Sequence, residues 1–85
     1  DMETFKGLPL AYKAGKIGGT MTAVFNAANE VAVELFMKEK IKFLEIYDII
    51  EKAMENHIPE EVKNLETILK ADQNTRNWVY EKYGK

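Results

Sequence analysis

The stretch GGTMTAVFNAANEVAV, residues 18–33, joins a helix-start signal to the most apolar helical pattern of this 85-residue chain. A hydroxyl after two glycines can accept a hydrogen bond from the free N–H groups of a first helical turn, so Thr20 or Thr22 is the expected N-cap. Apolar residues then recur at three- and four-residue spacing, at Val24, Ala27, Ala28, Val31, Ala32, Leu35 and Phe36. We therefore predict a helix from about Thr20 to Lys40 whose wide apolar arc has neighbours on more than one side.

On the N-terminal side of this helix, residues 1–7 carry no periodic pattern and are expected to form a leading arm. Residues 8–16 predict a short helix, with Pro9 tolerated in its first turn and Gly15 or Gly18 ending it.

On the C-terminal side, a third helix is predicted from Glu45 to Asn56, because the residue before Pro59 disfavours helical geometry. Its expected buried stripe is Ile46, Ile49, Ile50, Ala53 and Met54. Asn64 is a good N-cap for a fourth helix from Leu65 to Tyr83, which Gly84 ends. The stripe expected on this helix is Leu65, Ile68, Leu69, Val79, Tyr80 and Tyr83. The predicted fold is a single all-α domain over residues 1–85, a small antiparallel bundle of about four helices.

Composition narrows the function. A net charge of −2, with 31% charged residues, gives no large field of either sign, so neither nucleic acid nor a membrane is an expected partner. No apolar run approaches the ~20 residues that cross a bilayer. The absence of cysteine excludes a disulfide framework and is compatible with a cytoplasmic location, which we expect.

Residues for catalysis are scarce. The chain has no Ser, no Cys and one His, so an activated nucleophile beside a base is not indicated. His57, at a helix end, is more simply interpreted as a solvent-touching residue than as a catalytic base. Glu-x-x-His motifs for a di-metal site and the Cys/His set for structural zinc are both missing. The segment GKIGGT, residues 15–20, lacks the Lys-Ser/Thr step of a phosphate loop and is interpreted as a turn between helices. We assign no catalytic, cofactor-binding or metal residue.

Six residues are instead candidates for structural or interface roles: Thr20, Asn26, Asn29, Glu30, Asp72 and Arg76. Asn26, Asn29 and Glu30 share one arc of the central helix and could be solvated, tie the helix to another segment, or contact a ligand. Because asparagine has a low propensity for helix interiors, we favour a structural contact between these side chains and another segment. Asp72 and Arg76, spaced i,i+4 within an apolar stripe, are interpreted as a partly buried pair that fixes helix register or an interface.

Four segments, in order, resemble one enzyme family. Residues 18–33 resemble GGTMPAVLNAANEVAV from the C-terminal helical domain of the 1-deoxy-D-xylulose 5-phosphate reductoisomerase family. LAYKAG at residues 10–15 is similar to that family's LAYxAG, IKFLEI at 41–46 to IxFxDI, and ADQNTR at 71–76 to ADxxAR. Thr22, Glu45 and Thr75 stand where the family commonly has Pro, Asp and Ala, so Glu45 is a weaker cap for the third helix.

The resemblance implies a parent enzyme that uses NADPH and a divalent metal, Mg or Mn. That enzyme rearranges and reduces 1-deoxy-D-xylulose 5-phosphate to 2-C-methyl-D-erythritol 4-phosphate in the non-mevalonate isoprenoid pathway. In the family the nucleotide site and the metal ligands lie in upstream domains, and no residues here match their motifs. The resemblance therefore implies no cofactor in this fragment, with the remaining domains of a homodimeric parent as its partners.

Two hypotheses follow. In the first, the chain is the catalytically inactive C-terminal domain that braces the catalytic domain of such an enzyme. In the second, suggested by the same amphipathic stripes and the missing chemistry, it is a free-standing helical protein-interaction module.

Overall fold

The computed structural model describes residues 7–84, and within them the chain is all-α. The helices are α1 (Gly7–Ile17), α2 (Met21–Met37), α3 (Glu45–Asn56) and α4 (Leu65–Tyr83). The all-α prediction is confirmed, and the bounds of α3 and α4 agree with those expected. Residues 1–6 of the predicted arm lie outside the described residues, as does Lys85.

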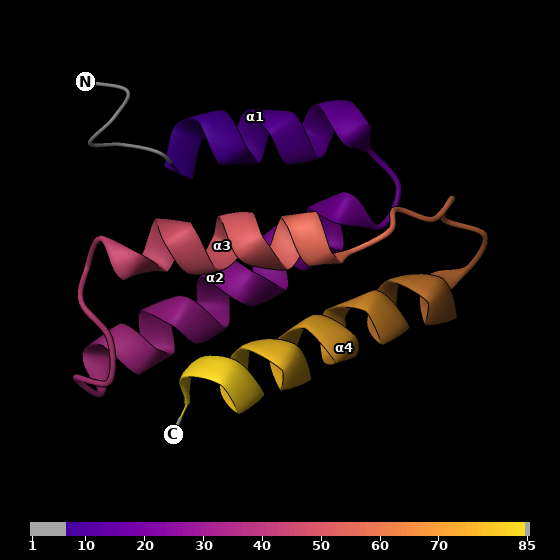
Figure 1. Cartoon of the computed structure of the whole chain (residues 1–85). Coiled ribbons are helices and arrows are strands. Elements are labelled where there is room, and N and C mark those ends of the chain that lie inside the picture. Colours follow the sequence, from indigo (N-terminus) through magenta and orange to yellow (C-terminus); the bar gives the residue numbers. More distant parts are fainter. Residues whose placement is uncertain (1–6, 85) are drawn as a thin grey trace.

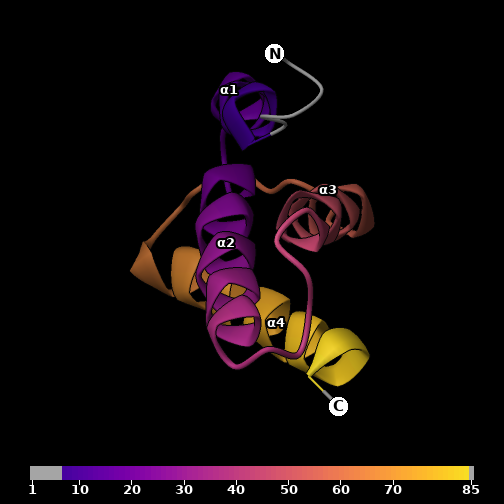
Figure 2. The same cartoon turned by 90° about the vertical axis from the view of Figure 1, so that its left-hand side faces the viewer.

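The helix α2 is the centre of the bundle, as the wide apolar arc predicts. Each helix runs in the direction opposite to the one before it (Figure 1). In Figure 2, α2 lies between α1 above and α4 below, with α3 beside it. The main helix contacts are those of α2 with α4 and with α3, while α4 touches α3 much less.

The core forms where the stripes of α2 and α3 meet. Every member of the stripe predicted on α3 is buried, and so is every member of that on α2 except Phe36, which is half-buried. Phe36 packs edge-on against Phe43 at 5.6 Å between ring centroids, and Phe43 packs likewise against Tyr47 at 6.0 Å. This aromatic row closes the end of the bundle where α2 turns into α3.

The stripe predicted for α4 is partly wrong. The buried residues of α4 are Ala71, Thr75 and Val79, whereas Leu65, Leu69 and Tyr80 are exposed. At about 100° per residue, the two leucines lie roughly a quarter turn away from the buried set. The sequence marks an apolar side of this helix, but α2 packs against a neighbouring side that carries smaller residues.

The end of α2 also differs from the prediction, since the helix stops at Met37 rather than Lys40. Glu39 has a positive φ of 60°. Its N–H donates to Phe36 O at 2.9 Å, and the Lys40 N–H donates to Leu35 O at 2.9 Å. These two bonds are the paired contacts of a Schellman motif, which usually places Gly at the left-handed residue. Because Glu stands there instead, the sequence carries no stop signal.

Side chains bond backbone N–H groups near the starts of both α3 and α4. The N-cap residue of α3 is Leu44, which makes no side-chain cap, so the cap role expected of Glu45 is wrong. Glu45 Oε1 accepts a hydrogen bond from the Lys42 N–H at 2.8 Å, so Glu45 orders the turn before α3. Asn64 Oδ1 accepts from the Thr67 N–H at 3.0 Å, which is the predicted cap of α4.

Candidate functional site: two polar junctions on the central helix

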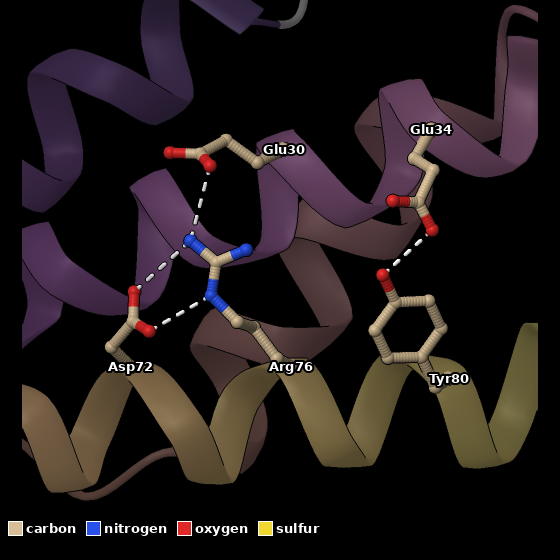
Figure 3. A network of polar contacts seen from close by, with 5 residues as sticks. All are labelled: Glu30, Glu34, Asp72, Arg76 and Tyr80. Carbon is tan, nitrogen blue, oxygen red and sulfur yellow. Dashed lines mark hydrogen bonds and ion pairs between the residues drawn. The ribbon is translucent and has the colours of Figure 1, made fainter.

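Arg76 is the centre of the first junction and links α4 to α2 (Figure 3). Its Nε donates to Asp72 Oδ2 at 2.8 Å and its Nη2 to Asp72 Oδ1 at 3.3 Å, so the pair predicted from i,i+4 spacing is bidentate. The same Nη2 donates to Glu30 Oε1 on α2 at 3.1 Å. The Asp72 carboxylate, followed by Glu30, raises the pKa of the Arg76 guanidinium. One guanidinium thus holds carboxylates from two helices.

One turn further along both helices, Tyr80 OH donates to Glu34 Oε2 at 2.7 Å. This hydrogen bond lowers the pKa of Glu34, with a smaller contribution from Lys38, whose Nζ lies 3.6 Å from the same oxygen. It also raises the pKa of Tyr80. Because residues 30 and 34 meet residues 76 and 80 in that order, α2 and α4 run in the same direction across this junction.

Thr20 forms the second junction, at the other end of α2. Thr20 occupies the N-cap position, as predicted, but its side chain makes no capping bond, so the expected hydrogen bond to the first turn of α2 is wrong. Its fully buried hydroxyl instead accepts a hydrogen bond from the Glu60 N–H at 2.9 Å and lies 2.7 Å from His57 Nε2. The Thr20 N–H donates in turn to Glu60 O at 3.0 Å. We call this set of Thr20, His57 and Glu60 the loop clasp, because it joins the α1–α2 turn to the α3–α4 connector.

Neutral imidazole suits the loop clasp. A threonine hydroxyl has one proton to donate, and since it already accepts from Glu60, it can donate that proton to Nε2 of a neutral His57. Partial burial lowers the pKa of His57, and the charge of Glu60 opposes this only in part. The interpretation of His57 as a residue near a helix end fits its C-cap position on α3, but its bond to Thr20 was not foreseen.

Gly19 explains why the two loops approach so closely. Its φ is +56°, and a Cβ at this position would collide with the Glu60 carbonyl. Glycine is therefore required here by both backbone conformation and space.

The two other candidate residues, Asn26 and Asn29, take part in neither junction. Asn26 is exposed and Asn29 half-buried on α2, and within residues 7–84 neither amide has a side-chain hydrogen bond to another residue. Of the three residues grouped on this arc, Glu30 is the one that contacts α4 directly.

The chemistry available at both junctions is hydrogen bonding and charge pairing. Among the described residues, no group of three His, Cys, Asp or Glu could hold a metal ion. Two hollows of about 290 and 400 Å³ flank His57 and share the lining residues Glu60 and Asn74. Both are open to solvent; the first is mainly polar, whereas the second is also lined by Ile58 and Trp78. A Ser or Cys nucleophile is absent from the chain. No helix in the described part is long and apolar enough to span a membrane.

Comparison with known proteins places this arrangement in a family. A family model described as the DXP reductoisomerase C-terminal domain matches residues 1–78. A protein named 1-deoxy-D-xylulose 5-phosphate reductoisomerase from Caldanaerobacter subterraneus subsp. tengcongensis is 55% identical over 83 residues, which are 98% of this chain and 22% of that protein. Proteins of the same name from Clostridium novyi and Bacillus cereus are 48% identical over 98% of the chain and 52% identical over 95% of it, covering 22% and 21% of their own lengths.

No solved structure matches the chain significantly. The chain spans about a fifth of the length of the curated relatives it matches. These matches do not favour a free-standing interaction module. The four helices agree with this family, and so do the four similar segments, which occur in the same order along the chain. Because the matches cover nearly the whole chain, the chain belongs to the DXP reductoisomerase C-terminal domain family.

Proposed function

We propose that this chain is the C-terminal domain of an enzyme that converts 1-deoxy-D-xylulose 5-phosphate to 2-C-methyl-D-erythritol 4-phosphate with NADPH. The observation that carries the proposal is identity of about half over nearly all of the chain to proteins that bear the reductoisomerase name. The four segments that resemble the family are spread over the whole fold. Residues 10–15 lie on α1, residues 18–33 in the turn before α2 and on α2, residues 41–46 at the start of α3, and residues 71–76 on α4.

In this proposal the chain supports the fold of the parent and does not carry its chemistry. The two junctions are ties between helices, and residues 7–84 supply no set of metal ligands. We therefore assign the NADPH site and the divalent metal, Mg or Mn, to the parent polypeptide outside this chain. We also propose a homodimeric, cytoplasmic parent that binds neither nucleic acid nor membrane, in keeping with the small net charge of this domain.

The test compares the 85-residue chain with the full-length protein that contains it. With 1-deoxy-D-xylulose 5-phosphate, NADPH and Mg²⁺ or Mn²⁺, the full-length protein is expected to oxidise NADPH and the 85-residue chain is not. Circular dichroism of the isolated chain provides the control, since a helical spectrum shows that inactivity is not a failure to fold. Turnover by the isolated chain would refute the supporting role, and an inactive full-length protein would refute the proposed activity.

A further inference from the structure

One side of the molecule combines exposed apolar side chains with the Arg76 junction. We call it the α2–α4 face and define it by Asn26, Glu30, Val33 and Met37 on α2 and Leu65, Leu69, Asp72 and Arg76 on α4. On each helix these residues follow one another at spacings of three and four, so they lie along one flank. Figure 3 shows this flank at its centre, where Arg76 reaches from α4 to Glu30.

The large apolar side chains of this face are left exposed to solvent. Leu65 is 68% exposed and Leu69 57%, although α4 begins with an apolar pattern that predicts burial. Val33 and Met37 are also exposed, at the opposite end of the face on α2. Because α2 and α4 run in the same direction here, the face has an apolar group at each end and a polar centre. Contiguous apolar groups bordered by polar residues mark contact surfaces.

The polar centre is bridged by ion pairs and still has hydrogen-bonding groups available to a partner. Asp72 and Glu30 fix the guanidinium of Arg76 through its Nε and Nη2. The amide of Asn26 stands exposed on the same flank, with two donors and an acceptor oxygen. A partner with apolar side chains at the two ends and a backbone or amide group opposite Asn26 would complement this face.

A second copy of the chain is a poor occupant. In a two-fold contact the face would meet itself. Two carboxylates, those of Glu30 and Asp72, hold the single guanidinium of Arg76, so the centre of the face carries more negative than positive charge. A two-fold contact would therefore bring carboxylates against carboxylates, and like charges set together across an interface are costly.

The parent polypeptide outside this chain is the occupant that the comparisons favour. The matched region is 22% of the relatives' length, so most of each relative lies outside it. We propose that the remainder of the parent protein docks on the α2–α4 face, with Leu65 and Leu69 as its apolar anchors. This proposal rests on the proposed function, because it requires a parent enzyme to supply the partner.

Thiol accessibility in the full-length protein tests the proposal. Leu69→Cys places a thiol on the face, and Leu44→Cys is the matched control, since Leu44 is 62% exposed and lies before α3, away from the face. Maleimide labelling, read by mass spectrometry of the peptide that carries the introduced thiol, is expected to be roughly tenfold or more slower at position 69, because access requires undocking. Equal labelling of the two thiols would overturn the proposal. Protection that disappears on dilution would assign the face to a second copy and would also overturn it.

A second measurement uses Leu65→Gln and Leu69→Gln together. Both side chains are exposed in this chain, so the isolated domain is expected to keep its unfolding midpoint, while in the full-length protein the unfolding of this domain shifts to lower temperature. An unchanged midpoint in the full-length protein would contradict the docking. NADPH oxidation by the unsubstituted full-length protein is measured alongside: if it is present, failure of the docking tests leaves the proposed function standing, and if it is absent, the proposed function itself fails.

Discussion

Glu39 is the residue at which backbone conformation and residue type disagree most clearly. Placing any residue other than glycine in the left-handed region costs about 1–2 kcal/mol, because its Cβ crowds the following carbonyl. The Schellman bonds of Glu39 and Lys40 hold the residue there nonetheless.

Glu39→Gly is therefore expected to raise the free energy of unfolding by about 0.5–1 kcal/mol, the relief of this strain less the greater flexibility of unfolded glycine. Urea denaturation followed by circular dichroism measures the change. Glu39→Ala is the control and is expected to give no comparable gain, since alanine keeps the Cβ. A destabilised glycine variant would show that the Glu39 side chain stabilises the fold in some other way.

His57 makes stability depend on pH. The pKa of His57 is lowered in the folded chain, whereas in the unfolded chain it has its ordinary value of about 6.5. As pH falls, the unfolded chain therefore takes up the proton first. The stabilisation that comes from neutral His57 is complete above about pH 6.5, and it is lost as pH falls from there toward the pKa of His57 in the folded chain. Urea denaturation between pH 7.5 and about 5.5 should show the free energy of unfolding decreasing with acid. In His57→Gln this slope should flatten, and an unchanged slope would assign the effect to other groups.

The bounds of α3 and α4 were predictable because residues next to each helix end determine where it starts or stops. Pro59 bars the continuation of α3, Asn64 caps α4 and Gly84 follows its last turn. The end of α2 was not predictable, because its left-handed residue is a glutamate. The Asp72–Arg76 pair follows from its spacing on one helix, whereas the Glu30 contact depends on how two helices meet.

The same limit explains the loop clasp and the first half of α4. Thr20 meets His57 and Glu60 across 37 and 40 residues of chain, and no local pattern reports such a contact. Leu65 and Leu69 show correctly that one side of α4 is apolar. The sequence of this domain alone does not say what covers that side, since α2 covers a different one.

The Arg76–Glu30 link between α2 and α4 is expected to contribute modestly, because Glu30 is 65% exposed and Arg76 29%. A double-mutant cycle of Arg76→Ala and Glu30→Ala should give a coupling of about 0.2–1 kcal/mol, and less in 1 M salt. Pairing Arg76→Ala with Glu66→Ala, an exposed acid in the first turn of α4, is the control, with no coupling expected. Coupling that persists unchanged in high salt would contradict a solvent-exposed ion pair.

The stability of the domain depends on one small core around α2. Leu35 is among the largest fully enclosed side chains, packed where α2 and α3 meet. Leu35→Ala is expected to cost about 2–5 kcal/mol, a large part of the margin of a domain this small. Met37→Ala, at an exposed position two residues along the same helix, should change stability by less than about 0.5 kcal/mol in the isolated chain. Thermal unfolding of both variants measures the contrast, and equal effects would show that the core is not centred on Leu35.

The loop clasp also affects how the molecule opens. Its bonds close a circuit of about forty residues that runs through α2 and α3 and returns along the connector. The backbone amides of Thr20 and Glu60 can exchange their hydrogens with water only when that circuit is broken, whereas amides inside a helix end can exchange by fraying. These two amides are therefore built-in reporters of one event, the lifting of the α3–α4 connector from the start of the central helix.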